Sequence, residues 1–98
     1  MFIILLKFSD NKSQASQFME DHKKWIKQGF DDSVFLMAGS LQPGLGGALL
    51  AHNSSREDLE DRVNNDPFVA ENVVNAEILE VSPAMMDEQL KMILKEAA

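Results

Sequence analysis

The sequence predicts an α+β fold in which helices cover one face of a four-stranded antiparallel sheet. Two stretches in the N-terminal half have apolar side chains at alternate positions, as strands do, and a strongly amphipathic helix lies between them. A further strand, helix and strand follow in the second half. In order, the chain reads β-α-β-β-α-β with an extra C-terminal helix. We expect a single domain over residues 1–98, because 98 residues is an ordinary length for one domain.

Four strands are expected, and the first two are apolar on both faces. The first covers Phe2–Phe8 and the second covers 34–41. We expect the first strand to lie centrally in the sheet and to be covered on both sides. The third, over 48–52, is short and rich in small residues, which indicates close approach by a backbone or a ligand, or a simple hairpin. The fourth covers 75–81.

The helix between the first two strands is expected over 13–29. Ser13 is a candidate N-cap, with Ser9 and Asp10 as competitors for that position. Gly29 is expected to end the helix, because glycine favours the position after a helix C-terminus.

One face of this helix is apolar except for a single histidine. Residues at intervals of three and four share that face: Ala15, Phe18, Met19, His22, Trp25 and Ile26. His22 therefore points at the same place as its apolar neighbours. A buried polar group without a partner costs about 1–3 kcal/mol, so we expect His22 to have one.

Three further helix signals lie in the second half of the chain. Ser54 and Glu57 have the spacing of a capping box. Asp66 precedes a proline, and an aspartate N-cap followed by proline predicts the start of a short helix that runs through about residue 74. The last helix is expected over about 83–96, opened by its proline.

Composition excludes several classes of function. The net charge of −7 disfavours nucleic acid and anionic membranes as partners, and no segment approaches the roughly 20 apolar residues that span a bilayer. The N-terminal apolar run lacks the features of a signal peptide. The chain has no cysteine, which excludes disulfides and thiol catalysis and fits a cytoplasmic protein.

The predicted sheet has one apolar face that its two helices cannot cover. The order of elements fits a ferredoxin-like plait, in which both helices lie on the same side. Either the last helix folds over the other face, or a second subunit packs on it sheet to sheet. Met85, Met86 and Met92 in the last segment suit an interface. We therefore expect a homodimer, with the last helix helping to close the contact or docking a higher assembly.

Four short motifs, in this order and spacing, give a family resemblance. They are the strand at 2–6, His22 on the first helix, AGSL at 38–41 and DPF at 66–68. Over residues 1–81 the chain resembles the YciI-like (YCII-related) family of the dimeric α/β-barrel superfamily, and the last helix extends beyond it. The resemblance implies a ferredoxin-like dimer with a cleft in each subunit. It also implies an active site on His22 and Asp66 and elimination or isomerisation chemistry on ring compounds.

General acid–base catalysis is the chemistry that His22 and Asp66 would support. An imidazole exchanges protons near neutral pH, and a carboxylate on its other nitrogen fixes the tautomer. The pair would move a proton next to a carbonyl or drive loss of a leaving group. No covalent nucleophile, metal site or cofactor is expected. The candidate substrate-binding residues are Ser40, Gly46, Gly47, Phe68 and Trp25.

Each of these residues also has a purely structural interpretation. His22 can be a core histidine satisfied by a backbone carbonyl, and Asp66 can be an N-cap alone. Ser40 and the glycines can be ordinary strand-end and turn residues. His52 is expected to be solvated, as are the lysines at 23, 24 and 27.

Two functions therefore stay open. The first is a small cytoplasmic enzyme that acts on a small, partly apolar and cyclic metabolite. The second is a non-catalytic dimeric module that binds a small molecule or a partner protein.

Overall fold

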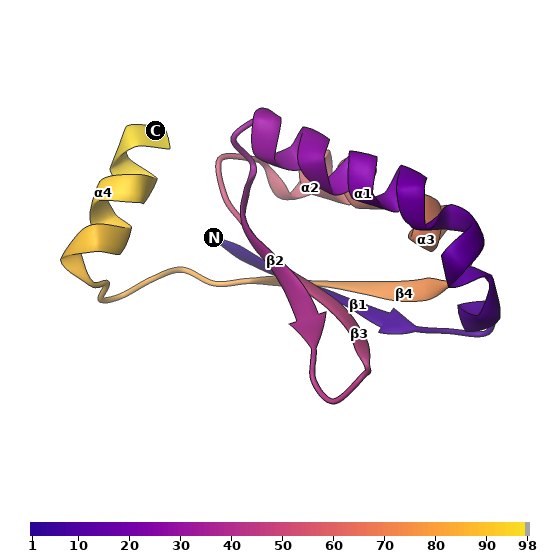
Figure 1. Cartoon of the computed structure of the whole chain (residues 1–98). Coiled ribbons are helices and arrows are strands. Elements are labelled where there is room, and N and C mark those ends of the chain that lie inside the picture. The colour runs from indigo at the N-terminus through magenta and orange to yellow at the C-terminus, as the bar shows by residue number, and fades with distance from the viewer. Residues whose placement is uncertain (98) are drawn as a thin grey trace.

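The computed structural model describes residues 1–97 and shows an α+β fold, which confirms the predicted class (Figure 1). Its elements are β1 (Phe2–Phe8), a 3₁₀ turn η1 (Lys12–Gln14), α1 (Ala15–Asp31), β2 (Phe35–Leu41), β3 (Gly46–Ala51), α2 (Arg56–Asn64), α3 (Pro67–Ala70), β4 (Val74–Glu80) and α4 (Glu88–Ala97). The sheet is antiparallel with the order β2-β3-β1-β4. This is the ferredoxin-like arrangement that the sequence predicts.

The helices α1, α2 and α3 lie together on one face of the sheet (Figure 1). The strand register decides which side chains meet them. Ile4 pairs with Leu49 on one side and with Ile78 on the other, and all three face the helices. Burial of these side chains against α1 and α2 supplies the core, at about 1.5–3 kcal/mol for each large apolar side chain.

Both expected ends of α1 are wrong by about two residues. The helix begins at Ala15 after the 3₁₀ turn, and Ser13 lies within that turn and caps nothing. At the other end the helix continues to Asp31 and passes through Gly29. Gly29 is buried, and a Cβ at this position would overlap the ring of Phe35. Close packing on β2, rather than a helix stop, therefore explains this glycine.

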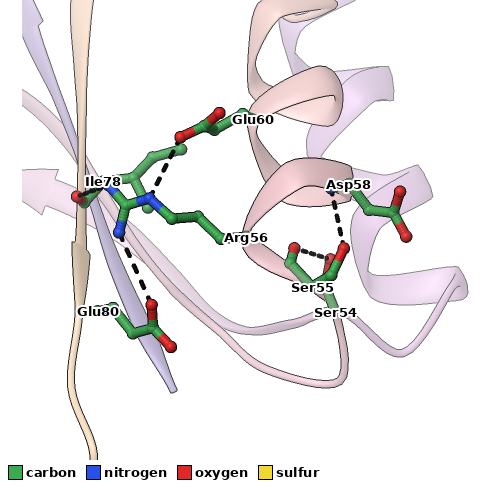
Figure 2. Close-up of polar contacts among 7 residues, drawn as sticks. All are labelled: Ser54, Ser55, Arg56, Asp58, Glu60, Ile78 and Glu80. Carbon is green, nitrogen blue, oxygen red and sulfur yellow. Dashed lines mark hydrogen bonds and ion pairs between the residues drawn. The ribbon is translucent and has the colours of Figure 1, made fainter.

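A serine cap starts α2, one residue later than the sequence predicts. The Ser55 hydroxyl accepts a hydrogen bond from the backbone N–H of Asp58 at 3.1 Å (Figure 2). From the first turn, Arg56 reaches the edge strand β4. Its guanidinium donates to the Ile78 carbonyl at 3.2 Å and lies 3.8 Å from the Glu80 carboxylate. These contacts tie α2 to the outer edge of the sheet.

Asp66 caps α3 as the sequence predicts, but α3 is a single turn that ends at Ala70 instead of continuing to residue 74. The last helix also differs from its prediction. The segment from Pro83 to Asp87 is not helical, and α4 begins at Glu88. Proline permits a helix start but does not require one, because its fixed φ also suits extended chain.

The other face of the sheet carries apolar side chains that no helix of the described residues covers. Ile3, Leu5 and Leu50 are half-buried there, while Met37 and Leu79 are 47% and 41% exposed. α4 stands off beyond the end of the sheet and does not fold over this face (Figure 1). Within residues 1–97, no helix combines the length and the apolar character needed to cross a membrane.

Candidate functional site

A cavity of about 350 Å³ opens between α1 and the helix-covered face of the sheet. α1 contributes Met19, His22, Lys23 and Ile26, and these four lie at intervals of three and four along the helix. The floor comes from β1, β4 and the hairpin β2–β3, and Phe68 of α3 completes the wall. The lining residues from these elements are Leu6, Phe8, Val74, Ala38, Gly39, Ser40, Gly46, Gly47 and Phe68.

His22 and Asp66 lie 44 positions apart in the chain and are in direct contact. Nδ1 of His22 and Oδ1 of Asp66 are separated by 2.7 Å. Asp66 has no exposed surface, and 12% of the His22 side chain is exposed. The partner of the helix-face histidine is therefore a carboxylate, not a backbone carbonyl. Because Nδ1 faces Asp66 and the ring lines the cavity, Nε2 is the nitrogen left for a ligand.

The same carboxylate oxygen has a second, structural contact. Oδ1 of Asp66 accepts the backbone N–H of Phe68 at 3.1 Å and so caps α3. The other oxygen, Oδ2, is buried and has no hydrogen-bond partner among the described residues. Asp66 thus makes both of its side-chain hydrogen bonds through one oxygen, which contacts His22 and the first backbone N–H of α3. The catalytic and capping interpretations of Asp66 are therefore compatible.

Aromatic packing fixes the orientation of the His22 ring. The ring lies parallel to that of Phe68, with centroids 3.9 Å apart and planes 4° apart. Trp25 stacks more loosely at 5.9 Å and donates its indole N–H to the Arg62 carbonyl at 2.9 Å. Phe68 lines the cavity, as proposed from sequence, but Trp25 does not. One turn further along α1, Trp25 faces α2 instead.

The three other sequence candidates lie together at the hairpin side of the cavity. Ser40 pairs with Gly47 across β2 and β3, and the register turns both toward the helices. Gly46 has a different constraint: its φ is +134°, and a Cβ there would overlap the Leu6 carbonyl. The neighbouring backbone of β1 thus accounts for Gly46. At Gly47 a Cβ would meet nothing nearer than the Gly39 carbonyl at 3.5 Å, so this glycine leaves open space in the cavity.

Sequence reasoning missed Lys23 as a cavity residue, because it grouped Lys23 with two solvated lysines. The helical spacing was the available signal, since Lys23 follows Met19 by four positions and precedes Ile26 by three. A lysine can pack its methylene chain on an apolar wall while the ammonium stays in water. Lys23 therefore belongs to the rim of the cavity.

His52, expected to be solvated, is buried instead, with 7% of its surface exposed. It follows β3 at the end opposite the hairpin, where its backbone N–H binds the Val34 carbonyl at 2.9 Å. Burial lowers the pKa of His52, and the positive N-terminus adds to this effect, while a hydrogen bond with the Ser33 backbone opposes it. His52 does not line the cavity.

Metal binding finds no obvious ligand set in the described part of the chain. Within residues 1–97, no three His, Cys, Asp or Glu side chains come together as a metal site would require.

Comparison with known proteins gives a structural match only. No family model matches the chain, and the search of curated proteins finds no match. Among solved structures, the chain is similar to 5-chloro-2-hydroxyhydroquinone dehydrochlorinase from Burkholderia phenoliruptrix AC1100, in complex with 2,5-dihydroxybenzoquinone. The TM-score is 0.68 at 12% sequence identity, and the match covers 84% of this chain and 94% of that one. At this identity the match shows a shared fold.

Proposed function

We propose that this chain is a small enzyme that uses His22 and Asp66 for general acid–base catalysis. One observation carries the proposal: a fully buried carboxylate contacts Nδ1 of an imidazole at 2.7 Å, and the same imidazole lines a cavity of about 350 Å³. A buried carboxylate behind a histidine holds one tautomer and supports the positive charge that forms when the ring accepts a proton.

The roles of the two residues follow from their geometry. Asp66 accepts the Nδ1–H, which leaves the lone pair of Nε2 available in the cavity. Nε2 would remove a proton from a carbon next to a carbonyl group. The electron pair of that C–H bond then forms a C=C bond. In an isomerisation this new bond joins the carbonyl carbon, the C=O π electrons move onto oxygen to give an enolate, and Nε2–H returns the proton at another atom. In an elimination the new bond joins the carbon that carries the leaving group, which departs with its bonding electrons. Typical contributions of such a base are about 10²–10⁴-fold in rate.

The substrate class that we propose is a small cyclic molecule with a carbonyl or hydroxyl oxygen. The cavity wall is mainly apolar, and Ser40 places a hydroxyl in it. The structural neighbour is named for removal of chlorine from a hydroxylated ring and holds a ring dione. Its fold and ligand support the proposal for this chain by analogy.

Proton exchange at carbon tests the proposal without knowledge of the natural substrate. Cyclic ketones and hydroxylated rings would be incubated with the protein in D₂O, and deuterium incorporation followed by proton NMR. We expect exchange by the wild-type chain and its loss in His22→Ala, whose fold is checked by circular dichroism. Lys24→Gln is the control on the same helix, since Lys24 does not line the cavity. Equal exchange by wild type and His22→Ala would contradict the proposal.

A non-catalytic binding module remains the second candidate, and one observation favours it. The N-cap contact to Phe68 gives Asp66 a structural role that requires no chemistry. This function predicts that cyclic ligands bind in the cavity and protect the protein from thermal unfolding, while neither wild type nor His22→Ala exchanges carbon-bound protons.

We also propose that the chain is a YciI-like cytoplasmic protein that forms a homodimer through the open face of the sheet. The exposed Met37 and Leu79, with the half-buried Leu50 between their strands, support this interface. Apolar patches of this kind mark interaction surfaces. Light scattering should give a dimer mass at micromolar concentration and a monomer for Leu50→Glu. Gln17→Glu, which adds the same charge at an exposed position of α1 on the opposite face of the sheet, should stay dimeric. A monomeric wild type would contradict the proposed dimer.

A further inference from the structure

The cavity is lined by few polar side chains, and the described residues of its lining include a cation but no carboxylate. Among the described residues that line it, Lys23 alone carries a permanent charge, and no carboxylate is part of the lining. His22 and Ser40 are the other side chains with polar atoms there. The cavity thus offers one cation and two further hydrogen-bonding groups on otherwise apolar walls.

Lys23 forms no ion pair with the side chains that the structure describes, whereas two other cations of α1 and α2 do. Lys27, four residues later on α1, lies 2.9 Å from Asp31, and Arg62 lies 2.9 Å from Asp32. Among the side chains described, those of residues 1–94, no carboxylate lies within ion-pair distance of Lys23. Its ammonium is available to a ligand, and its flexible stem lets it follow that ligand.

The charge of the whole protein makes such a cation significant. The chain carries a net charge of −7, and the Asp66 carboxylate is buried directly behind His22. Both disfavour entry of an anion into the cavity. A cation at the rim offsets this repulsion locally, and its attraction is stronger beside an apolar wall than in bulk water.

We infer that Lys23 binds an anionic oxygen of the ligand, so that the cavity selects small cyclic monoanions, such as ring carboxylates, over their neutral analogues. The inference rests on the proposed function, because it assumes that the cavity beside His22 is where the ligand binds. The ring of the ligand would lie on the apolar walls, with its anionic oxygen at the rim. Lys23 is then a specificity-determining residue, distinct from the proton-transfer pair.

Matched acids and amides test this inference directly. Binding of benzoate and cyclohexanecarboxylate would be compared with that of benzamide and cyclohexanecarboxamide by isothermal titration calorimetry. The His22 ring signals in NMR spectra would report whether each probe occupies the cavity. We expect both acids to bind more tightly than their amides, and added salt to weaken binding of the acids alone.

Substitutions on α1 then assign the effect to one lysine. Lys23→Gln should weaken acid binding on the order of tenfold, as expected for a charge-assisted contact at a partly solvated site, and leave amide binding unchanged. Lys23→Glu should weaken acid binding further. Lys24→Gln makes the same change in net charge outside the cavity and should alter neither. Unchanged circular dichroism in all variants excludes unfolding as the cause.

The outcomes separate this inference from the proposed function. If acids and amides bind equally and still perturb His22, or if Lys24→Gln weakens the acids as much as Lys23→Gln does, Lys23 does not select anions, while acid–base catalysis at His22 still stands. If Lys23-dependent acid binding is found but no proton exchange occurs at any carbon, the inference holds and the catalytic proposal fails. Absence of any acid binding at millimolar concentration overturns the inference.

Discussion

The two histidines of this chain are similarly buried but have different surroundings. His22 contacts a carboxylate through one ring nitrogen and lines a cavity with the rest of the ring. His52 is 7% exposed, lies at the far end of β3 and has a pKa lowered mainly by burial. His52, which is buried but does not line the cavity, is therefore best explained as a structural residue. A carboxylate partner together with access to a cavity yields a candidate for proton transfer.

The largest expected effect comes from removing the carboxylate that distinguishes His22. Asp66→Ala leaves the Phe68 N–H and the His22 Nδ1 without their partner inside the protein. We expect it to lower the free energy of unfolding by about 2–4 kcal/mol, measured by urea denaturation. Asp66→Asn keeps an oxygen for the helix cap and should lose less. Equal losses in the two variants would mean that capping does not contribute to stability.

Access to the cavity can be removed while the His22–Asp66 contact is kept. A side chain at position 47 points to the helix-covered face, where a Cβ meets nothing closer than 3.5 Å. Gly47→Leu should therefore fill part of the cavity and weaken ligand binding, and any proton exchange, by about tenfold or more. Ala76→Leu lies on the same face outside the cavity and serves as the control. Full binding by Gly47→Leu would show that the ligand binds elsewhere.

The aromatic support of His22 is expected to contribute less. Trp25→Phe keeps most of the ring but loses the indole hydrogen bond to the Arg62 carbonyl. We expect a loss of about 1 kcal/mol in unfolding free energy and little change in ligand binding, because Trp25 does not line the cavity. A large drop in ligand binding with unchanged stability would place Trp25 in the site after all.

The smallest effect is the dependence of stability on pH through His52. Its pKa is lowered in the folded state, so the unfolded state binds more protons as the pH falls below the ordinary value of about 6.5. Stability should therefore decline from that pH downward until the folded-state pKa is reached. His52→Gln should flatten this part of a plot of unfolding midpoint against pH. An unchanged slope would show that His52 is not responsible.

The carboxylate of Asp32 makes stability depend on pH in a lower range than His52 does. Hydrogen bonds from Arg62 and Gln28 lower the pKa of Asp32 below its ordinary value of 3.8. The stabilisation from Asp32 is present above pH 3.8 and is lost as the pH falls through the lowered pKa. As the pH falls, the loss of stability from His52 begins near pH 6.5, and the loss from Asp32 begins only near pH 3.8.

The sequence predicted the elements whose signals are local. Alternation in Phe2–Phe8 and the DPF motif at 66–68 depend on neighbouring residues, and the strand and the Asp66 cap are found as predicted. Gly29 and Pro83 were assigned by their usual positions at helix ends. In the structure Gly29 is required by the ring of Phe35, six positions away and on another element. The residues next to Gly29 in the sequence do not indicate such a tertiary constraint.

Parts of the candidate site could also be predicted because their signals are local in the sequence. The helical face that carries His22 is local, and its carboxylate partner was proposed from the family resemblance and is found in contact. Lys23 shares the spacing of that face, but its charge placed it among solvated residues. Burial of His52 depends on how β3 packs at its end, which the short strand pattern does not reveal.

The tautomer of His22 tests the central claim most directly. Proton abstraction by His22 requires a proton on Nδ1, donated to Asp66, and a bare Nε2 facing the cavity. Long-range proton–nitrogen correlation spectra of ¹⁵N-labelled protein, recorded at about pH 8, distinguish a protonated ring nitrogen from a bare one. We predict a protonated Nδ1 and an unprotonated Nε2 whose signal shifts when a ligand enters the cavity. A proton on Nε2 with a bare Nδ1 would contradict the account, because the nitrogen in the cavity would then be unable to accept one.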